Sequence, residues 1–290
     1  MKLLYIIYTH NRPIILKECL ATLFSNTNVK PHRVVILDDA SEKSTKVGLW
    51  QFCLENSTKE MPIDMLSFNE NIGYGTNFEF GLSVARVYNP EYVFFVESDY
   101  IFRKNWAEDI LEVFESEIGK KSIGISGYDH PDFYTPERYD KMYRNIIKED
   151  YGSDPVNRTN MFKLFDCTLG NKTLKLSGIS NSCGTIYLKW RFTMELMKKY
   201  PEMKTTWWER LANKQPGGNR KLLADGPLSH GLSYYWSLYA KEQGWDTSKY
   251  FPLLNIVPSV SNHINALGIN GNIPGIQEGQ TFVGSPSFSQ

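Results

Sequence analysis

Short apolar runs alternate with stretches of helical apolar spacing along the first hundred residues. Four runs are continuous enough to suit strands buried on both faces of a sheet, at residues 3–8, 33–37, 63–68 and 92–96. The stretches between them carry apolar residues three or four positions apart: Leu16, Cys19, Leu20, Leu23 and Phe24, then Val47, Trp50 and Leu54, then Phe80, Val84 and Val87. The order β-α-β-α-β-α-β predicts right-handed crossovers and a mostly parallel α/β sheet.

The rest of the chain shows a weaker pattern of apolar positions. It predicts helices at about 105–121, 189–200 and 232–243, strands at 122–126 and around 183–187, and a loop or insertion at 132–172. The tail from Ala266 is rich in Gly, Asn, Ser and Pro, which favours an extended arm or a flap.

A polar cluster follows each of the four early strands, at residues 9–12, 38–39, 69–77 and 97–99. In a parallel sheet the carboxyl ends of the strands share one edge, where α/β proteins bind ligands. Four clusters far apart in sequence would therefore meet at that edge. This convergence predicts a ligand site there.

The cluster Glu97-Ser98-Asp99 directly follows the apolar run Val93–Val96. Two acids one residue apart can hold a divalent cation, which in turn can hold a diphosphate. Simpler interpretations remain for each cluster: a solvated acidic turn here, a turn and helix start at Asp38-Asp39, and a glycine-rich connection at 69–77. Ser41 is expected to cap the helix that follows the second strand.

Composition narrows the classes of partner. Lys+Arg and Asp+Glu are equal at 32 each, so no excess of positive charge indicates nucleic acid. No stretch is apolar enough to predict a membrane span. The four cysteines show no metal-binding spacing, and Cys19 and Cys53 fall on predicted helix faces, so buried thiols and a cytoplasmic location are expected.

Taken in order, the polar clusters and the strands before them resemble the GT-A glycosyltransferases, above all the large family 2 of nucleotide-sugar-dependent transferases. The segments that carry the resemblance are 8–12, 35–41, 71–75 and 97–99, and more loosely 182–192, 236–245, Phe251-Pro252 and His263. The resemblance implies a GT-A, Rossmann-like fold, whose mostly parallel sheet is flanked by helices and followed by a C-terminal acceptor-side portion. Residues 1–105 would form the nucleotide-sugar-binding half, residues 106–265 the acceptor-binding and catalytic half of the same domain, and residues 266–290 a flexible tail or flap.

The resemblance also implies roles for individual residues. Asp99 would hold Mn²⁺ or Mg²⁺ bridging the diphosphate, with His263 as a further metal or diphosphate contact, although His263 could equally be a loop histidine without a role. Asp39 would contact the base, with Asp38 beside it. The residues expected around the nucleotide sugar are Thr9, Asn11, Arg12, Asp38, Asp39, Asn71, Gly73, Asn77, Glu97 and Ser98.

One departure from the family leaves the general base open. Inverting members usually carry an acidic pair at the start of the late helix, where this chain has Leu232-Ser233-Tyr234-Tyr235. The candidates are Asp225 and Asp129. An acceptor surface could be built from aromatic side chains, although core packing explains them as well; they are Trp207, Trp208, Tyr234, Tyr235 and Trp236.

The first hypothesis is a metal-dependent glycosyltransferase that moves a sugar from UDP-sugar or another nucleoside-diphosphate sugar to a hydroxyl of a glycan, a lipid-linked or another acceptor. A nucleotidyltransferase is a second hypothesis, although residues 9–13 contain one Arg and no Gly, unlike a phosphate-binding loop. The third is a transferase-like module that has lost catalysis and binds a glycan or a partner. The missing acidic pair is its best support.

Overall fold

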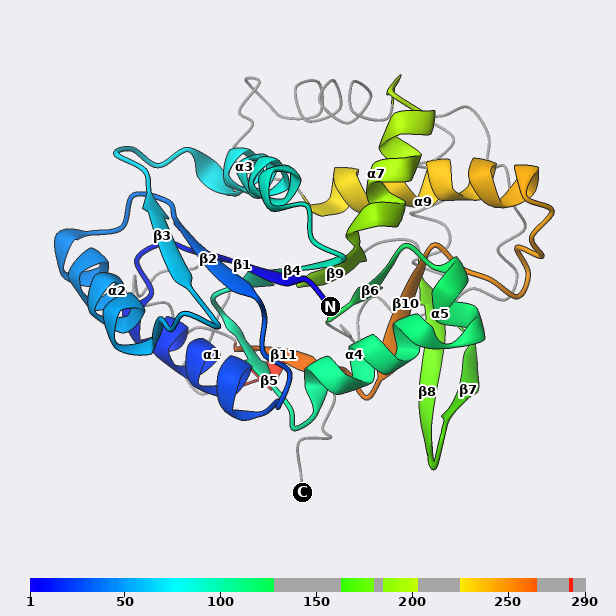
Figure 1. Cartoon of the computed structure of the whole chain (residues 1–290), viewed down its shortest axis with the longest axis horizontal. Coiled ribbons are helices and arrows are strands. Elements are labelled where there is room, and N and C mark those ends of the chain that lie inside the picture. The colour runs from blue at the N-terminus through cyan, green and yellow to red at the C-terminus, as the bar shows by residue number, and fades with distance from the viewer. Residues whose placement is uncertain (128–162, 180–184, 203–224, 265–281, 284–290) are drawn as a thin grey trace.

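The computed structural model describes residues 1–127, 163–179, 185–202, 225–264 and 282–283. For residues 74–75, 225–230, 262–264 and 282–283, which lie within helices and strands, only the backbone is described. Figure 1 shows a central sheet with helices on both faces. The helices are α1 (Pro13–Ser25), α2 (Lys43–Asn56), α3 (Gly73–Tyr88), α4 (Trp106–Glu115), α5 (Glu117–Lys121), α7 (Trp190–Lys199) and α9 (Asp225–Glu242).

The four early strands form the parallel half of the sheet. They are β1 (Leu3–Thr9), β2 (Arg33–Asp38), β3 (Ile63–Ser67) and β4 (Tyr92–Glu97). β1 pairs in parallel with both β2 and β4, and β2 pairs in parallel with β3. The expected α/β architecture is confirmed, because α1, α2 and α3 connect successive strands that run parallel in one sheet.

The second half extends the same sheet with mixed strand directions. The strands are β6 (Gly124–Ser126), β7 (Leu164–Leu169), β8 (Lys172–Ile179), β9 (Ile186–Lys189) and β10 (Leu253–Val257), in the sheet order β3-β2-β1-β4-β9-β6-β10-β8-β7. β9 runs antiparallel between β4 and β6. The expected loop at 132–172 is therefore wrong at its end, where β7 and the start of β8 form an antiparallel hairpin.

A small second sheet lies beyond the end of β4. It consists of β5 (Tyr100–Phe102), β11 (Ser261–Ile264) and β12 (Phe282–Val283), with β11 antiparallel to both neighbours. Because β5 begins directly after Asp99, this sheet connects the end of β4 to the last described part of the chain.

Two apolar layers enclose the main sheet. The ring of Tyr5 stacks on Phe94 at 5.4 Å and packs against Trp106 at 5.7 Å, on the face covered by α1, α2 and α4. The alternate residues Ile6 and Tyr8 face α3, α7 and α9. Many of the abundant aromatic residues are therefore core residues, and Trp236, fully buried, donates from Nε1 to the carbonyl of Lys121 at 2.6 Å.

Some helix details differ from the sequence-based expectations. The helix expected at 105–121 is broken at Ser116, whose hydroxyl caps α5 by accepting from the amide of Gly119. Ser41 does not cap α2; Glu42 takes the cap position, and the Ser41 hydroxyl accepts from the amide of Asn11 at 2.9 Å.

The apolar residues whose spacing predicted α2 and α3 are mostly not the buried ones. α2 buries Thr45, Leu49 and Cys53, which leaves Val47, Trp50 and Leu54 exposed. On α3 the residues that recur every seven positions, Phe80 and Val87, are exposed as well, although Val84 is buried.

The expected buried thiols are confirmed for Cys19 and Cys53, which are free cysteines. None of the described helices is both long enough and apolar enough to cross a bilayer.

Candidate functional site

The carboxyl ends of β1, β2 and β4 lie side by side. Thr9 is the register partner of Asp38, and Tyr8 is the partner of Glu97. The pairing continues one step past each strand, because Asp39 N donates to Thr9 O at 2.9 Å and Ser98 N donates to Tyr8 O at 3.0 Å. The structure thus brings three of the four predicted polar clusters to one edge of the sheet, which we call the rim.

The fourth cluster, at 69–77, is tied to the rim by Asp39. Its Oδ1 accepts from Ile72 N at 2.7 Å and its Oδ2 accepts from Gly73 N at 3.0 Å. The two amides belong to the start of α3, where a carboxylate is favoured by the helix dipole and by the unpaired N–H groups. Gly73 adopts φ +78°, a conformation that favours glycine. Asp39 therefore fixes the approach of α3 to the rim.

Asp38, expected beside the base, lies fully buried beneath the rim. Its carboxylate accepts from the hydroxyl of Ser67 at 2.6 Å and from Ser41 N at 3.3 Å. These contacts connect the end of β2 to the end of β3 and to the segment before α2. The geometry gives Asp38 a role in holding the strand ends together.

His10 is the centre of a polar network on the rim. Its Nδ1 lies 2.6 Å from Asp39 O, and its Nε2 lies 3.4 Å from Asn71 Nδ2. With Nδ1 protonated and donating to the carbonyl, Nε2 accepts from the amide of Asn71. These contacts hold the His10 ring between the backbone of Asp39 and the side chain of Asn71, which gives His10 a structural role on the rim.

Asn11 joins the rim to the start of α2. Its Oδ1 accepts from Glu42 N at 2.6 Å, and its own backbone has φ +46°. Ala40 also has a positive φ, +57°, which is uncommon for a residue with a Cβ. Such conformations persist where the surrounding contacts enforce them, and they concentrate at ligand sites.

Asp99 and Glu97, the two acids at the end of β4, make different contacts. Asp99, 6% exposed, forms an ion pair with the guanidinium of Arg12, whose side chain is about one-third exposed. Glu97 is half-buried at the strand end, and its backbone carbonyl accepts from the thiol of Cys19 at 3.7 Å. Burial raises the pKa of the Cys19 thiol, and the charge of Asp99 adds to the increase. Burial likewise raises the pKa of Tyr8, with Glu97 adding to it.

Two buried polar atoms near the rim have no hydrogen-bond partner among the described residues: Thr9 Oγ1 and Asn77 Oδ1. Leaving a buried polar atom unpaired costs roughly 1–3 kcal/mol, so each calls for an explanation such as a ligand or a water. Both residues were expected around the nucleotide sugar. Ser98, also buried, has its backbone amide bound to β1.

The remaining predicted residues are only partly placed by the structure. The backbone of His263 in β11 pairs with Tyr100, the residue after Asp99, but its side chain is outside the described part of the chain. Asp225 is the first residue of α9, and its side chain is likewise not described. Asp129 lies outside the described residues.

Gly127, the residue after β6, is clamped close to the small sheet. Its amide donates to Thr185 O at 3.0 Å, and its carbonyl accepts from the amide of Ser261 at 3.0 Å and from the hydroxyl of Ser261 at 2.7 Å. A Cβ at this position would lie 2.0 Å from Thr185 Oγ1, so the close approach requires glycine.

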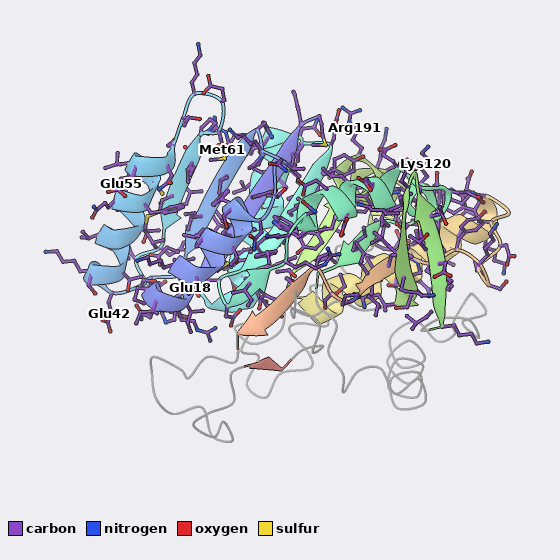
Figure 2. All side chains as sticks on the ribbon, turned by 90° about the horizontal axis from the view of Figure 1, so that it is seen from below. Glu18, Glu42, Glu55, Met61, Lys120 and Arg191 are labelled. Atoms are coloured by element: carbon purple, nitrogen blue, oxygen red, sulfur yellow. The ribbon has the colours of Figure 1, made fainter. Side chains whose placement is uncertain are left out.

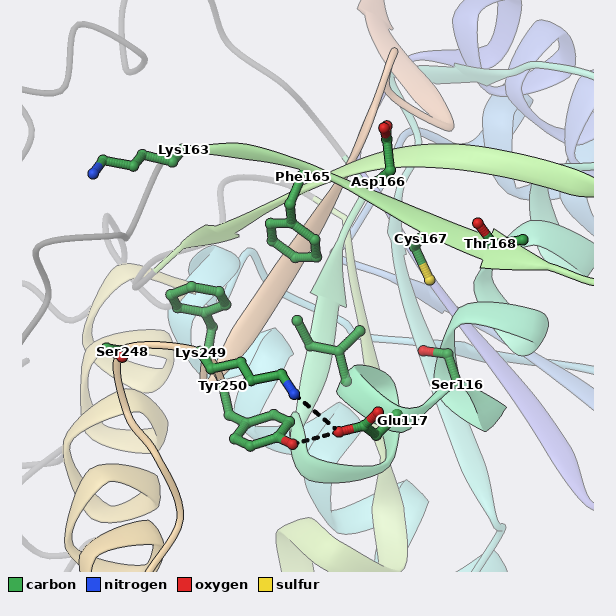
Figure 3. Close-up of a pocket in the computed structure, with 12 residues that line it drawn as sticks. Ser116, Glu117, Lys163, Phe165, Asp166, Cys167, Thr168, Ser248, Lys249 and Tyr250 are labelled. Atoms are coloured by element: carbon green, nitrogen blue, oxygen red, sulfur yellow. Dashed lines mark hydrogen bonds and ion pairs between the residues drawn. The ribbon is translucent and has the colours of Figure 1, made fainter.

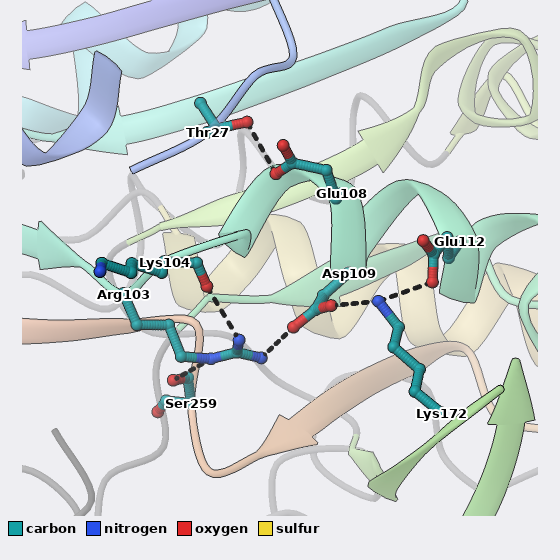
Figure 4. Close-up of polar contacts among 8 residues, drawn as sticks. All are labelled: Thr27, Arg103, Lys104, Glu108, Asp109, Glu112, Lys172 and Ser259. Atoms are coloured by element: carbon teal, nitrogen blue, oxygen red, sulfur yellow. Dashed lines mark hydrogen bonds and ion pairs between the residues drawn. The ribbon is translucent and has the colours of Figure 1, made fainter. Parts of the chain in front are cut away.

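A charged network supports the segment between Asp99 and β11 (Figure 4). Buried Asp109 of α4 accepts from Arg103 Nη2 and from Lys172 Nζ, both at 2.5 Å. Arg103 in turn donates from Nε to Ser259 O at 3.3 Å and from its backbone amide to Val260 O at 3.1 Å. The network thereby holds the entrance to β11 against the end of β5. Sequence reasoning missed it, because Lys172 is 63 positions from Asp109 and the carbonyls of Ser259 and Val260 are farther still along the chain.

Two hollows among the described residues lie away from the rim. One, of about 560 Å³, opens between β7, the start of α5 and the segment before β10 (Figure 3). Phe165 and Phe251 stack there at 5.9 Å, and Glu117 accepts from the hydroxyl of Tyr250 at 2.5 Å. Another, of about 800 Å³, lies between α1 and α2.

The described part of the rim has few side chains that could coordinate a divalent ion. The described residues include no group of three or more His, Cys, Asp or Glu side chains that could hold a metal ion. The carboxylate of buried Asp99 lies at the rim beside the guanidinium of Arg12. The residues present therefore fit a metal ion that is bound mainly by a diphosphate and by one carboxylate of the protein. The side chains that the structure describes do not form an all-protein cage for it.

A comparison with models of protein families shows to which family the chain belongs. The model described as glycosyl transferase family 2 matches residues 5–175, more than half of the chain. The chain belongs to glycosyl transferase family 2. The match spans every described strand of the rim and ends within β8 of the hairpin. The search of curated proteins found no match to this family 2 protein.

Solved structures with a similar arrangement are distant in sequence. The mannosyltransferase PcManGT from Pyrobaculum calidifontis, in complex with GDP-Man and Mn²⁺, is 12% identical, with a TM-score of 0.44 over 78% of this chain and 55% of that one. GalNAc-T7 with UDP, GalNAc and Mn²⁺ is 9% identical, with a TM-score of 0.49 over 91% and 44%. TarS from S. aureus is 20% identical, with a TM-score of 0.41 over 69% and 29%. The family 2 chain thus spans about half or less of each of these proteins.

Proposed function

We propose that this family 2 protein transfers a sugar from a nucleoside-diphosphate sugar to a hydroxyl acceptor. The observation that carries the proposal is the ion pair between Arg12 and Asp99, set on a rim that Asp39 joins to the start of α3. The rim thus offers a cationic group, a carboxylate and hydrogen-bonding groups within one strand edge. That combination suits a diphosphate with a nucleoside attached.

The donor would lie along the rim with its base on the side of β2 and its diphosphate on the side of β4. The carboxylate of Asp39 is occupied on one side by the amides of α3, but each oxygen keeps a second lone pair that can accept from a base N–H. Thr9, between these two strands, supplies a hydroxyl that lacks a partner in the described structure. The His10–Asn71 contact keeps the 69–77 segment in place above the donor.

The leaving diphosphate needs positive charge as its bond to the sugar breaks. Arg12 can supply part of that charge, because its partly exposed guanidinium can contact Asp99 and a phosphate oxygen together. Mn²⁺ or Mg²⁺, held by Asp99 and by the diphosphate, would act there as a Lewis acid. In this proposal Glu97 or Ser98 faces the donor ribose or the waters around the ion, and His263 is a further candidate from the neighbouring strand.

The acceptor hydroxyl needs a base within hydrogen-bond reach. Asp225 and Asp129 stay the two candidates, because both belong to segments that follow the rim elements in the acceptor half. The acceptor itself is a hydroxyl compound such as a glycan or a lipid-linked sugar. Tyr235 and Trp236 are buried and therefore serve the core, which removes them from the candidate acceptor surface.

An alternative function has one specific observation in its favour. In the structure Arg12 occupies the carboxylate that a metal would need, so a domain that binds the nucleoside diphosphate through Arg12 without a metal is also compatible with the geometry. Such a domain would be a binding module that has lost catalysis. The dependence of binding on Mn²⁺ separates the two functions.

The test is a thermal-shift screen of the full chain with nucleoside diphosphates and their sugars, with and without Mn²⁺. A ligand present at a hundredfold excess over its Kd stabilises the folded state by about 2.7 kcal/mol. We expect one nucleotide to raise the melting temperature only with Mn²⁺, and Asp99→Ala to abolish the increase.

The matched control is Asp166→Ala, which removes an exposed carboxylate paired with Lys175 on the β7–β8 hairpin. It should leave the ligand effect unchanged. A screen without any response, or an unchanged Mn²⁺-dependent response in Asp99→Ala, would contradict the proposal. A response that does not depend on Mn²⁺ would favour the binding module.

A further inference from the structure

One row of buried side chains crosses seven neighbouring strands of the main sheet and changes its character along the way. The row follows the register pairs of the sheet, one residue from each strand between β2 and β8. Its members are apolar from β2 to β9 and polar from β6 to β8: Val35, Ile6, Phe95 and Ile186, then Ser126, Asn255 and Ser177. We call the last three residues the polar row.

The polar row faces the same core as the apolar part of the row. Leu253 and Ile179, two positions from Asn255 and Ser177 along their strands, belong to the apolar layer on the side of α3, α7 and α9. Side chains two positions apart point to the same face of a sheet, and so do register partners in neighbouring strands. The polar row is therefore enclosed between the sheet and the helices that cover this face.

The polar row lies one layer below the edge of the sheet that carries the rim. Phe95, on the same level, stands two residues before the end of β4, or about 7 Å at 3.3 Å per residue. β6 runs parallel to β4, since both are antiparallel to β9. Figure 2 shows Met61 and Lys120, which precede β3 and β6, at one edge of the molecule, and Glu42, which follows β2, at the opposite edge. The polar row thus lies beneath the strand ends of the second half of the chain.

Asn255 is fully buried, and neither polar atom of its side chain, Nδ2 or Oδ1, has a hydrogen-bond partner in the described part of the chain. Of the buried side chains described, it alone leaves both a donor and an acceptor unpaired. Ser177, its register partner, is 1% exposed, and its Oγ is unpaired as well. Directly opposite residues of antiparallel strands have Cβ atoms about 4.5–5.5 Å apart. The three unpaired atoms therefore belong to one small site.

Other buried hydroxyl groups in this fold have partners. Ser261 Oγ donates to Gly127 O at 2.7 Å, and Ser122 Oγ donates to Gly119 O at 3.0 Å. A buried polar atom without a partner destabilises a fold, and such atoms are rare unless a water or a ligand binds them. Three such atoms at one site therefore indicate a bound group.

We propose that Asn255 and Ser177 form a buried subsite for two adjacent hydroxyl groups. One hydroxyl donates to Oδ1 of Asn255, and the other accepts from Nδ2. The hydroxyl of Ser177, which can both donate and accept, completes the contacts. Neither side chain is charged, so the subsite favours neutral hydroxyl groups over phosphates and carboxylates, whose burial without a countercharge is costly. Two water molecules supply such a pair of groups, and so do neighbouring hydroxyls of a sugar ring.

Water occupies the subsite in the ligand-free protein. A buried water typically makes about three hydrogen bonds to polar groups that are otherwise unpaired, and this site offers three such atoms. A serine stands on each side of Asn255, and serines fill less space than the Val, Ile and Phe side chains in the rest of the row. A sugar bound in the second half of the chain would replace the waters with its own hydroxyls. The sugar as occupant rests on the proposed transfer function, whereas the water does not.

Nuclear magnetic resonance of the full chain tests the subsite directly. In a deuterated, ¹⁵N-labelled protein, the side-chain amide of Asn255 is assigned by triple-resonance experiments, so no variant is needed. We expect this amide to show a cross-peak to water with the sign of a long-lived complex. An Asn255 amide without such a cross-peak in the sugar-free protein would overturn the proposal.

Four sugars distinguish the two sources of the hydroxyl groups. Glucose, galactose, mannose and N-acetylglucosamine are added in turn, and we expect at least one of them to shift the Asn255 amide signals and remove the water cross-peak. If all four leave both unchanged, the sugar as occupant is overturned and the subsite is a water site. Failure of every nucleotide in the thermal-shift screen would count against the transfer function and leave the water result intact.

Paired substitutions test whether Asn255 and Ser177 share their ligand. Asn255→Leu and Ser177→Ala should each lower the melting temperature by about 2–4 °C, because each removes hydrogen bonds to the bound hydroxyls. The double variant should lose less than the sum, because the first substitution already releases the shared ligand. The matched control is Ser122→Ala, which removes a buried hydroxyl that is paired with Gly119 O; its effect should add to that of Asn255→Leu.

Two results of these substitutions would contradict the subsite. An Asn255→Leu chain that melts above the wild type would show that the amide is unpaired in the native protein, since replacing an unpaired polar group with an apolar one of similar shape is stabilising. Strictly additive effects of Asn255→Leu and Ser177→Ala would show that the two side chains share no ligand.

Discussion

The guanidinium of Arg12 forms an ion pair with the carboxylate of Asp99, across 87 positions of sequence. Arg12 stands at the cap of α1, and Asp99 stands two residues past the end of β4. The pair places opposite charges where two parallel strands end, so either partner can be replaced by a charged group of a ligand. A phosphate could compete for Arg12, and a cation could compete for Asp99.

This competition predicts how Arg12 affects metal binding. Replacing Arg12 with Met removes a positive charge that now occupies Asp99, so Mn²⁺ should bind several-fold more tightly to the variant in the absence of nucleotide. Titration calorimetry with Mn²⁺ alone measures the change. In the double variant Arg12→Met/Asp99→Asn the gain should disappear. Equal Mn²⁺ affinities of the wild-type chain and Arg12→Met would show that the pair does not control access to the carboxylate.

The carboxylate of Asp39 should stabilise the start of α3. Asp39→Ala leaves the amides of Ile72 and Gly73 without their acceptor, and we expect it to lower the free energy of unfolding by about 2 kcal/mol. Asp39→Asn keeps one carbonyl oxygen and should lose less. Urea denaturation gives the difference, and hydrogen exchange at residues 72–73 tests whether the loss is local. Equal stability of both variants and the wild type would contradict the capping role.

Glu108 should make stability depend on pH. Partial burial acts to raise the pKa of Glu108, but hydrogen bonds from the amide of Asn28 at 2.7 Å and the hydroxyl of Thr27 at 2.8 Å outweigh it, so this pKa is lowered from its ordinary value of 4.5. A lowered pKa in the folded state stabilises the fold above the ordinary value, and the gain is lost as the pH falls through the folded-state pKa.

The matched variant for this effect is Glu108→Gln. At pH 7 it should be less stable than the wild type by about 0.5–1 kcal/mol, a modest figure because the side chain is partly exposed to screening solvent. The difference should shrink below about pH 4.5 and vanish at lower pH. Urea titrations at several pH values measure it. A difference that stays constant from pH 7 to pH 2 would rule out the carboxylate charge as the cause.

Two glycines with opposite surroundings give a paired prediction. Gly127→Ala would push a methyl group into Thr185 Oγ1 and the hydroxyl of Tyr187, at 2.0 and 2.5 Å, and should destabilise by roughly 1–3 kcal/mol. Gly48 lies inside α2, and no atom is within 4 Å of a Cβ added there. Gly48→Ala should therefore raise the free energy of unfolding by about 0.5–1 kcal/mol. Thermal unfolding of both variants checks the signs, and two changes of the same sign would contradict the geometry.

Much of the architecture follows from local pattern. The continuous apolar runs at β1, β2 and β4 predicted strands buried on both faces, and parallel order then places their polar ends together. The residues that line the rim were therefore predictable, from Thr9 to Asp99. The hairpin of β7 and β8 was missed, because its alternating exposed and buried residues carry a weak apolar signal.

Tertiary contacts decided what these same residues do. Sequence placed Asp38 and Asp39 as neighbours with similar chemistry; the fold buried Asp38 under the strand ends and turned Asp39 to the start of α3. Apolar spacing predicted that α2 and α3 are helices, but not that Trp50 and Val87 would remain exposed beside a sheet edge. Spacing reports periodicity along one helix, whereas burial depends on which neighbour covers each side. The sequence by itself determined where the strands end and which polar groups follow them; only the packed sheet decided which of those groups hold the fold together and which remain available to a ligand, because that depends on partners contributed by distant segments.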